Sequence, residues 1–333
     1  MRNSSQTLKL IEMEKHLWMC FCSMFALASC QQEEMSMSQQ GTLDLHVQAS
    51  IAGNEMSARS VTGEDGSSDF EEGDEIGFFM PYSSTPMKWT LASGSWKTDG
   101  KAEWKDKVNE YSFCAYYPYA KETTSSAQVV MPDLSKQTGT WNGLGEYDFL
   151  FARCLASYES NNGTVSFTGS SAFQHAYSLV SVTLIKDKEG EEVTLQKESF
   201  SGEGFFDKHY YKFDDKASLD GMVAVGESSA SPLTFTYKEG VALDIEGSHS
   251  AVILLNPSVS EKTLSYSAAY QRDGISYIAH TDGIKGEFKS GYCYKYKLRL
   301  TKEGLAVVGK EISQWNVESM EDILIEETPD NQQ

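Results

Sequence analysis

The stretch GYCYKYKLRLTKEGLAVVGKEI, residues 291–312, has the pattern of a β-hairpin. In its first half, Tyr292, Tyr294, Tyr296, Leu298 and Leu300 alternate with Cys293, Lys295, Lys297 and Arg299. A period of two gives a strand one apolar face and one polar face. Lys302, Glu303 and Gly304 then form a turn signal before the returning stretch LAVVGKEI. The stretch therefore predicts two antiparallel strands that pack on a core through one face.

Strand patterns continue outward from this hairpin along the whole chain. TLDLHVQAS (42–50) and YSFCAYYPY (111–119) alternate in the same way, and AVILLNP (251–257) is a continuous apolar run typical of a strand buried on both faces. In SYSAAYQRDGISYIAHT (265–281), Asp273 and Gly274 suit the positive φ angles of a two-residue hairpin turn. No segment longer than about 12 residues has a helical period. We therefore predict an all-β fold of sandwiches or barrels.

The 333-residue length favours two such domains. Gly169, Ser170 and Ser171 separate a strand pattern that ends at Phe167 from another that begins near Tyr177. We place the boundary at about residue 172, which gives an N-terminal domain at 41–172 and a C-terminal domain at 173–333.

The N-terminus has the pattern of an export signal. Leu17 to Ser29 is almost free of charge and follows a region with Arg2, Lys9 and Lys15. This apolar run is shorter than the roughly 20 residues that span a bilayer. LASC (27–30) resembles a bacterial lipobox, which predicts a signal peptide at 1–29 and a lipid on Cys30, with residues 30–40 as a tether. Several acyl chains on one residue anchor a protein stably. Met1 and Met13 both remain possible starts.

Gln31, Gln32, Glu33 and Glu34 directly follow Cys30. Acids in this place resemble the surface-export signal of Bacteroidota lipoproteins, which would put the protein on the outer face of the outer membrane. A solvated polar tether would have the same composition. The formal net charge of −20 repels nucleic acid and anionic lipid headgroups, so we expect neither as a partner.

The sequence contains no GxSxG, HExxH, GxxxxGK[ST] or CxxC motif. Its histidines are scattered, and we interpret His175 as structural. A glycosidase pair could be drawn from Glu71, Glu72, Asp74, Asp214 and Asp215, but nothing in their spacing selects one. The acidic run at 64–75 lacks the spacing of a calcium loop. We interpret Cys114, Cys154 and Cys293 as small buried residues. The sequence thus predicts no enzyme, no cofactor and no metal site.

Several further motifs occur in a characteristic order: FEEGDEIGFFM (70–80), FCAYYPY (113–119), DFLFA (148–152), FQHAYSLVSVTLI (173–185), and the closing GYCYKYKLRL with ISQWN (312–316). With the lipobox, they make the chain similar to the fimbrillin family, the lipoprotein pilins of Bacteroidota type V pili, including the major-fimbrium-like forms. The resemblance runs from about residue 40 to about residue 320. It implies two tandem transthyretin-like β-sandwich domains.

The resemblance also implies assembly by strand exchange. A surface protease cuts the lipidated precursor after an arginine, the first strand leaves, and a strand of another subunit takes its place. On this chain the cut falls between Arg59 and Ser60. Arg59 is the only Lys or Arg between Lys15 and Lys88. An ordinary loop arginine is the alternative interpretation.

The resemblance places the donor strand at the C-terminus, near 319–327. Met320, Ile323 and Ile325 supply apolar side chains there, but strict alternation fails between Met320 and Ile323. A local edge strand of the second domain would have a similar pattern. Stalk, tip and anchor positions all remain open.

The partners that follow from these interpretations are other fimbrial subunits in a homo- or hetero-polymer, the outer membrane through the lipid anchor, and a host or bacterial surface ligand. A competing hypothesis is a monomeric surface lipoprotein that binds glycan through exposed aromatic rings. Its candidate platforms are Trp89, Trp96, Trp104 and Trp141, which could equally pack in a sandwich core.

Overall fold

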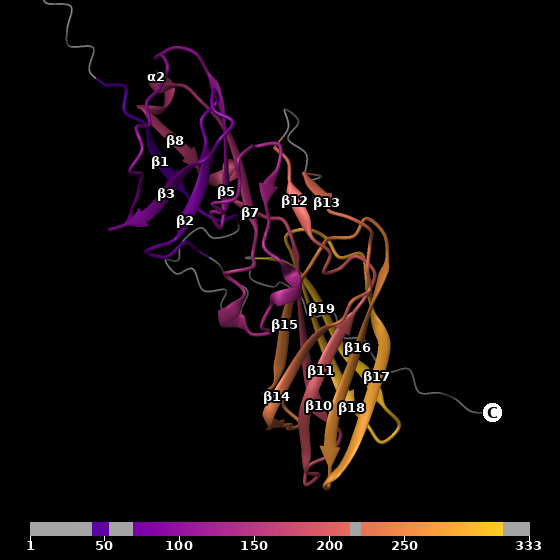
Figure 1. Ribbon diagram of the computed structural model, residues 1–333. Helices are drawn as coiled ribbons and strands as arrows, with labels where there is room; N and C mark the ends of the chain where they lie inside the picture. The colour runs from indigo at the N-terminus through magenta and orange to yellow at the C-terminus, as the bar shows by residue number, and fades with distance from the viewer. Residues whose placement is uncertain (1–41, 53–68, 214–220, 316–333) are drawn as a thin grey trace, which may run out of the picture. The chain divides into compact units, whose positions relative to one another are not determined.

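The computed structural model describes residues 42–52, 69–213 and 221–315, and strands dominate these ranges (Figure 1). The helical elements there are short: one α-helix, α2 (Tyr158–Asn161), and three single 3-10 turns, η1 (Leu134–Lys136), η2 (Trp141–Gly143) and η3 (Gly169–Ser171). The predicted all-β fold is confirmed. Among the described residues, no helix has the length and apolar character needed to cross a membrane.

Most strands between residues 46 and 175 form one large sheet and one small sheet. The large sheet has six strands in the order β4 (Ser95–Lys97), β3 (Met87–Ala92), β2 (Glu75–Phe79), β5 (Tyr111–Tyr117), β7 (Leu150–Ala156) and β9 (Gln174–His175). Every pair of neighbouring strands within this sheet is antiparallel. The small sheet pairs β1 (His46–Ala49) with β8 (Thr164–Phe167) in parallel. Side chains between Leu45 and Phe173 form one apolar cluster, which we call the N-terminal core.

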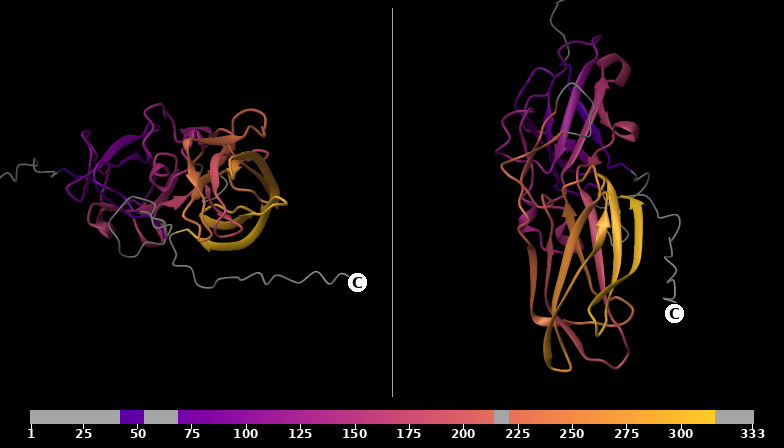
Figure 2. Two further views of the ribbon diagram at one scale, coloured as in Figure 1. Left: turned by 90° about the horizontal axis from the view of Figure 1, so that it is seen from below. Right: turned by 90° about the vertical axis from the view of Figure 1, so that its right-hand side faces the viewer.

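Residues 178–314 supply two four-stranded sheets, and Figure 2 shows this part of the chain in orange to yellow from two further sides. One has the order β15 (Ser250–Leu255), β10 (Ser178–Lys186), β18 (Tyr292–Leu300) and β19 (Leu305–Gln314). The other has the order β14 (Leu233–Ala242), β11 (Val193–Ser201), β16 (Lys262–Arg272) and β17 (Ile275–Gly286). Only the β10–β18 pair is parallel within these two sheets. A third, three-stranded sheet joins β13 (Met222–Ala224), β12 (His209–Tyr211) and β6 (Val129–Val130).

The predicted hairpins form where the sequence placed them. β18 and β19 pair antiparallel from Leu300 with Leu305 outward. Asp273 and Gly274, with φ angles of 50° and 79°, turn the chain between β16 and β17. Positive φ at both positions matches the right-handed twist of a hairpin. β15 is buried along nearly its whole length, as its continuous apolar run predicted.

The chain changes sheets between His175 and Ser178, because β9 pairs with β7 whereas β10 pairs with β15 and β18. The second apolar cluster takes most of its members from residues 176–315, with others from residues 79–151. The division of the chain at about residue 172 remains a prediction.

A buried carboxylate connects the two four-stranded sheets. Glu198 occupies a fully buried position on β11. Tyr237 of β14 and Tyr266 of β16 both donate hydrogen bonds to its carboxylate, the latter at 2.9 Å. His249, which directly precedes β15 in the other sheet, places Nε2 3.1 Å from Glu198 Oε1. The carboxylate therefore holds three side chains from both layers, in the way that a buried charge needs.

Several tyrosines should make the fold sensitive to alkaline pH. Burial raises the pKa of Tyr116 to about 12, and burial together with the Glu198 charge raises the pKa of Tyr237 and of Tyr266. The unfolded chain loses these protons near pH 10. Their stabilising contribution is therefore complete below pH 10 and falls above it, by about 1.4 kcal/mol per pH unit for each tyrosine. Urea unfolding followed between pH 8 and pH 11.5 should show a constant free energy of unfolding to about pH 9 and a steep fall above pH 10; a constant value throughout would contradict the assignment.

Candidate functional site

The first described strand, β1, bonds to β8 along one edge, and the residues that precede β1 bond to a second segment. Towards β8, the bonds run from His46 N to Gly163 O and from Ser50 N to Phe167 O, each 3.0 Å long. Towards the segment at 102–104, they run from Leu45 N to Ala102 O (3.0 Å) and from Trp104 N to Leu43 O (2.8 Å). The strand neighbour of β1 is therefore β8, and the bonds to residues 102–104 come from the two residues Leu43 and Leu45 that precede β1.

The inward face of β1 and its flanks completes the N-terminal core. Leu45, Val47 and Ile51 are buried, with 5%, 7% and 4% of their surface exposed. Leu43 and Ala49 pack against the same core, and Asp44, His46 and Gln48 point outward. This alternation confirms the predicted strand. The inward side chains occupy every second position from 43 to 51, which we call the β1 groove positions.

Most of the predicted processing and assembly residues lie outside the described ranges. These are Cys30 for the lipid, Arg59 and Ser60 for the cut, and Met320, Ile323 and Ile325 for the donor strand. The described chain stops at Ala52 and resumes at Asp69, so the predicted cut falls in the interval that directly follows β1.

The FEEGD motif forms a turn that anchors the chain after this interval. Phe70 packs edge to face on Trp96 and on Phe173, with ring centroids 5.2 Å apart in each case. Asp74 accepts hydrogen bonds from the backbone N–H of Glu71 (2.7 Å) and from the hydroxyl of Tyr117 (3.1 Å). The motif therefore fixes an aromatic side chain in the N-terminal core next to β1.

The carboxylate of Glu72 bonds to the turn between β3 and β4. It accepts the N–H groups of Ser93 (2.8 Å) and Gly94 (2.6 Å), and these bonds lower the pKa of Glu72. The motif carboxylates of Glu72 and Asp74 thus have structural partners, and Asp214 and Asp215 lie outside the described ranges. In the part of the chain that is described, no three His, Cys, Asp or Glu side chains group together as metal ligands.

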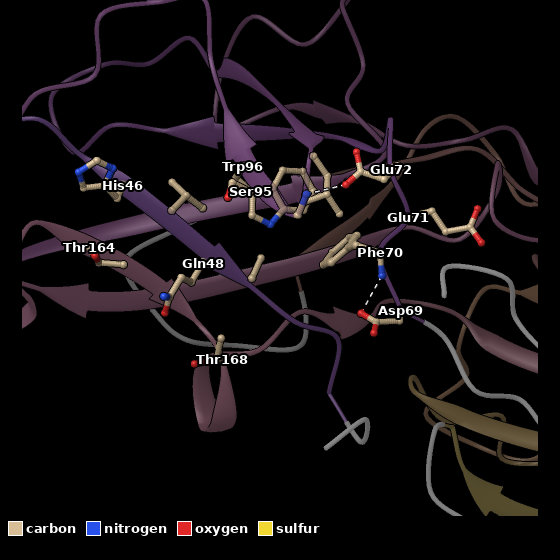
Figure 3. Close-up of a pocket in the computed structure, with 14 residues that line it drawn as sticks. His46, Gln48, Asp69, Phe70, Glu71, Glu72, Ser95, Trp96, Thr164 and Thr168 are labelled. Atoms are coloured by element: carbon tan, nitrogen blue, oxygen red, sulfur yellow. Dashed lines mark hydrogen bonds between the residues drawn. The ribbon is translucent and has the colours of Figure 1, made fainter. Parts of the chain in front are cut away.

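A cleft of about 800 Å³ lies beside β1 (Figure 3). One side is formed by His46, Val47, Gln48 and Ala49 of β1 with Thr164 and Thr168; the other is formed by Asp69, Phe70, Glu71, Glu72, Leu91, Gly94, Ser95 and Trp96. Apart from His46, the ionisable side chains lining it are carboxylic acids. The cleft therefore places three acidic side chains, Asp69, Glu71 and Glu72, beside β1.

The prediction of exposed tryptophan platforms is wrong for three of the four residues. Trp89, Trp96 and Trp104 have 3%, 8% and 4% of their surface exposed and belong to the N-terminal core. Trp104 also donates from Nε1 to Gly163 O at 2.9 Å. Trp141 is half-buried and packs against the second cluster. Trp89 and Trp104 therefore present no ring face to a sugar, whereas Trp96 also lines the cleft beside β1.

His175 has structural partners, as predicted. Its Nδ1 lies 2.8 Å from Asp148 Oδ2, and its ring stacks on Trp315 with the centroids 3.8 Å apart. The cysteines also fit their interpretation, since Cys154 and Cys293 are buried and Cys114 is half-buried. Burial raises the pKa of Cys154 to about 12 and that of Cys293 to about 11, which makes both thiols poor nucleophiles.

The model of the fimbrillin-like family matches residues 59–315 of this chain. Two solved structures show the same fold: a candidate cell adhesion protein from Bacteroides ovatus, at 16% identity and a TM-score of 0.52, and another from Bacteroides uniformis, at 19% identity and a TM-score of 0.53. They cover 84% and 83% of this chain, and 99% of each of them is covered. No curated protein sequence matches the chain. Because the family model spans most of the sequence, the chain belongs to the fimbrillin-like family, as its motifs predicted.

Proposed function

We propose that this protein is the precursor of a subunit of a cell-surface fimbria, matured by removal of β1 and joined to its neighbours by strand exchange. Membership of the fimbrillin-like family supports the fimbrial role and the contact with other fimbrial subunits. The observation that carries the exchange mechanism is the segment 43–51 around β1, which bonds to β8 and to residues 102–104 and buries one face in the N-terminal core. Arg59 follows this segment shortly after in the sequence.

Removal of β1 would leave the fold with an open groove. The carbonyl groups of Ala102, Gly163 and Phe167 would lose their partners, and the core would be exposed at the groove positions. Unpaired backbone groups beside apolar surface are costly, and another β-strand satisfies both at once. A strand lent by a neighbouring subunit therefore restores the fold and joins the two proteins. This binding function needs no catalytic residue.

The remaining elements of the proposal come from the sequence. Cys30 carries the lipid that holds the precursor on the outer membrane, and residues 30–40 form the tether. The two sandwiches comprise 41–172 and 173–333, and the segment at 319–327 is the donor strand for the next subunit. Glycan binding receives no support from the tryptophans, three of which are buried.

The proposal is tested by the N-terminus and mass of the protein recovered from the cell surface. The wild-type protein should begin at Ser60 in polymers that resist mild detergent. Arg59→Ala should keep the lipidated Cys30 and remain monomeric, because the protease loses its target. Lys88→Ala removes the next basic side chain, which is exposed, and should behave as wild type. Wild-type polymers that retain Cys30 would overturn maturation by strand removal.

A further inference from the structure

The groove that β1 now fills, which we call the β1 groove, restricts the side chains of any strand that replaces β1. Leu43, Leu45, Val47, Ala49 and Ile51 are all apolar and face the N-terminal core. Val47 is central among them and lies opposite Val165 of β8, which has no exposed surface. An ionised carboxylate placed at a buried apolar position without a partner is strongly unfavourable. A replacement strand must therefore carry side chains without charge at these alternate positions.

The cleft beside the groove adds an electrostatic requirement. Asp69, Glu71 and Glu72 line the same cleft as the outward side chains of His46 and Gln48 (Figure 3). A strand with acids on its outward face would be repelled there, whereas a strand with basic residues would be attracted. The groove and the cleft together favour a strand that is apolar on one face and neutral or basic on the other.

The C-terminal sequence of this same chain does not meet these requirements. Residues 316–333 read NVESMEDILIEETPDNQQ. Every alignment of five alternate residues from this segment with the groove positions places at least one Asp or Glu inward. The most apolar alignment uses Val317, Ser319, Glu321, Ile323 and Ile325, and it places Glu321 at the position of Val47. Reversing the strand direction leaves Glu321 at this central position.

From these observations, and resting on the proposed function, we infer that the β1 groove accepts a strand from a different protein and excludes the C-terminal segment of another copy. The partner strand has five alternate apolar side chains, no inward acid, and neutral or basic residues outward. This subunit therefore sits at a junction between unlike subunits and does not form a homopolymer through this groove.

The inference is tested by competition on the whole chain cut after Arg59, in which β1 stays in the groove until a peptide displaces it. Release of the N-terminal fragment is measured for four peptides: residues 42–52, residues 316–333, and the latter with Glu321→Val or with Glu318→Val. The peptide concentration that releases half of the N-terminal fragment should be at least about 100-fold higher for the 316–333 peptide, the tail peptide, than for the 42–52 peptide. Glu321→Val should lower this concentration by about 10-fold or more, because it removes the inward acid. Glu318→Val removes the same charge from the outward face and should change this concentration by less than about 3-fold.

The outcomes separate the inference from the function on which it rests. If even the 42–52 peptide fails to exchange, the groove does not open and the proposed function fails. If the 42–52 peptide exchanges and the unmodified tail peptide exchanges equally well, strand exchange holds and the exclusion of this chain's own tail is wrong. Equal gains from Glu321→Val and Glu318→Val would likewise overturn the role of the inward position.

Discussion

Replacement of Val47 by aspartate is expected to lower the free energy of unfolding of the uncleaved chain by about 3 to 5 kcal/mol. Val47 is 7% exposed at the centre of the buried face of β1, opposite the fully buried Val165. The aspartate would lose its hydration among the apolar side chains of the N-terminal core. Urea unfolding followed by tryptophan fluorescence measures the effect directly, because Trp89, Trp96 and Trp104 lie in the same core.

Gln48→Asp provides the matched control, since it introduces the same group on the neighbouring, exposed position of the strand. The expected change in its free energy of unfolding is within about 1 kcal/mol.

Strand exchange has a separate consequence for the Val47→Asp variant. The substitution is removed with β1, so a cleaved subunit whose groove holds a wild-type strand should unfold as wild type does. A loss below about 1 kcal/mol for Val47→Asp in the uncleaved chain would show that β1 contributes little to the core.

Local patterns predicted the strands well because they depend on near neighbours. The β16–β17 turn needs only Asp273 and Gly274, and the β18–β19 hairpin needs only alternation on either side of a turn. The alternation in TLDLHVQAS also predicted the apolar face of β1. By contrast, the tryptophans were ambiguous, because a ring on an exposed face and a ring in a core can have the same neighbours in sequence.

Long-range contacts were not predictable from the pattern. Nothing in the sequence pairs β10 with β18 across more than a hundred residues, or places Ala102 against Leu45. Glu198 shows a further limit. Alternation from Val193 and Leu195 puts Lys197 inward, but the β-bulge between Leu195 and Lys197 reverses the phase. Glu198 consequently faces the core, because an extra residue in a strand exchanges its two faces.

Glu198→Ala should lower the free energy of unfolding by about 3 to 5 kcal/mol. The substitution removes the shared partner of Tyr237, Tyr266 and His249 and leaves their polar groups in the interior between the two four-stranded sheets. Glu198→Gln keeps a polar side chain of the same shape that can both accept and donate, so we expect it to cost roughly 1 to 2 kcal/mol. The measurement is again urea unfolding, at pH 7, where Tyr237 and Tyr266 keep their protons because burial and the Glu198 charge raise the pKa of each.

Tyr237→Phe is the control for simple loss of one hydrogen bond, and its expected cost is about 1 kcal/mol. Equal costs for Glu198→Ala and Tyr237→Phe would show that the carboxylate does not organise the cluster. The Glu198 effect should also persist after cleavage at Arg59, because the side chains of this cluster all come from residues 198–266, far from β1. The Val47→Asp penalty should disappear once a wild-type strand fills the groove. This difference follows if the first strand is exchangeable while the sheets built from residues 178–314 keep their own strands throughout assembly.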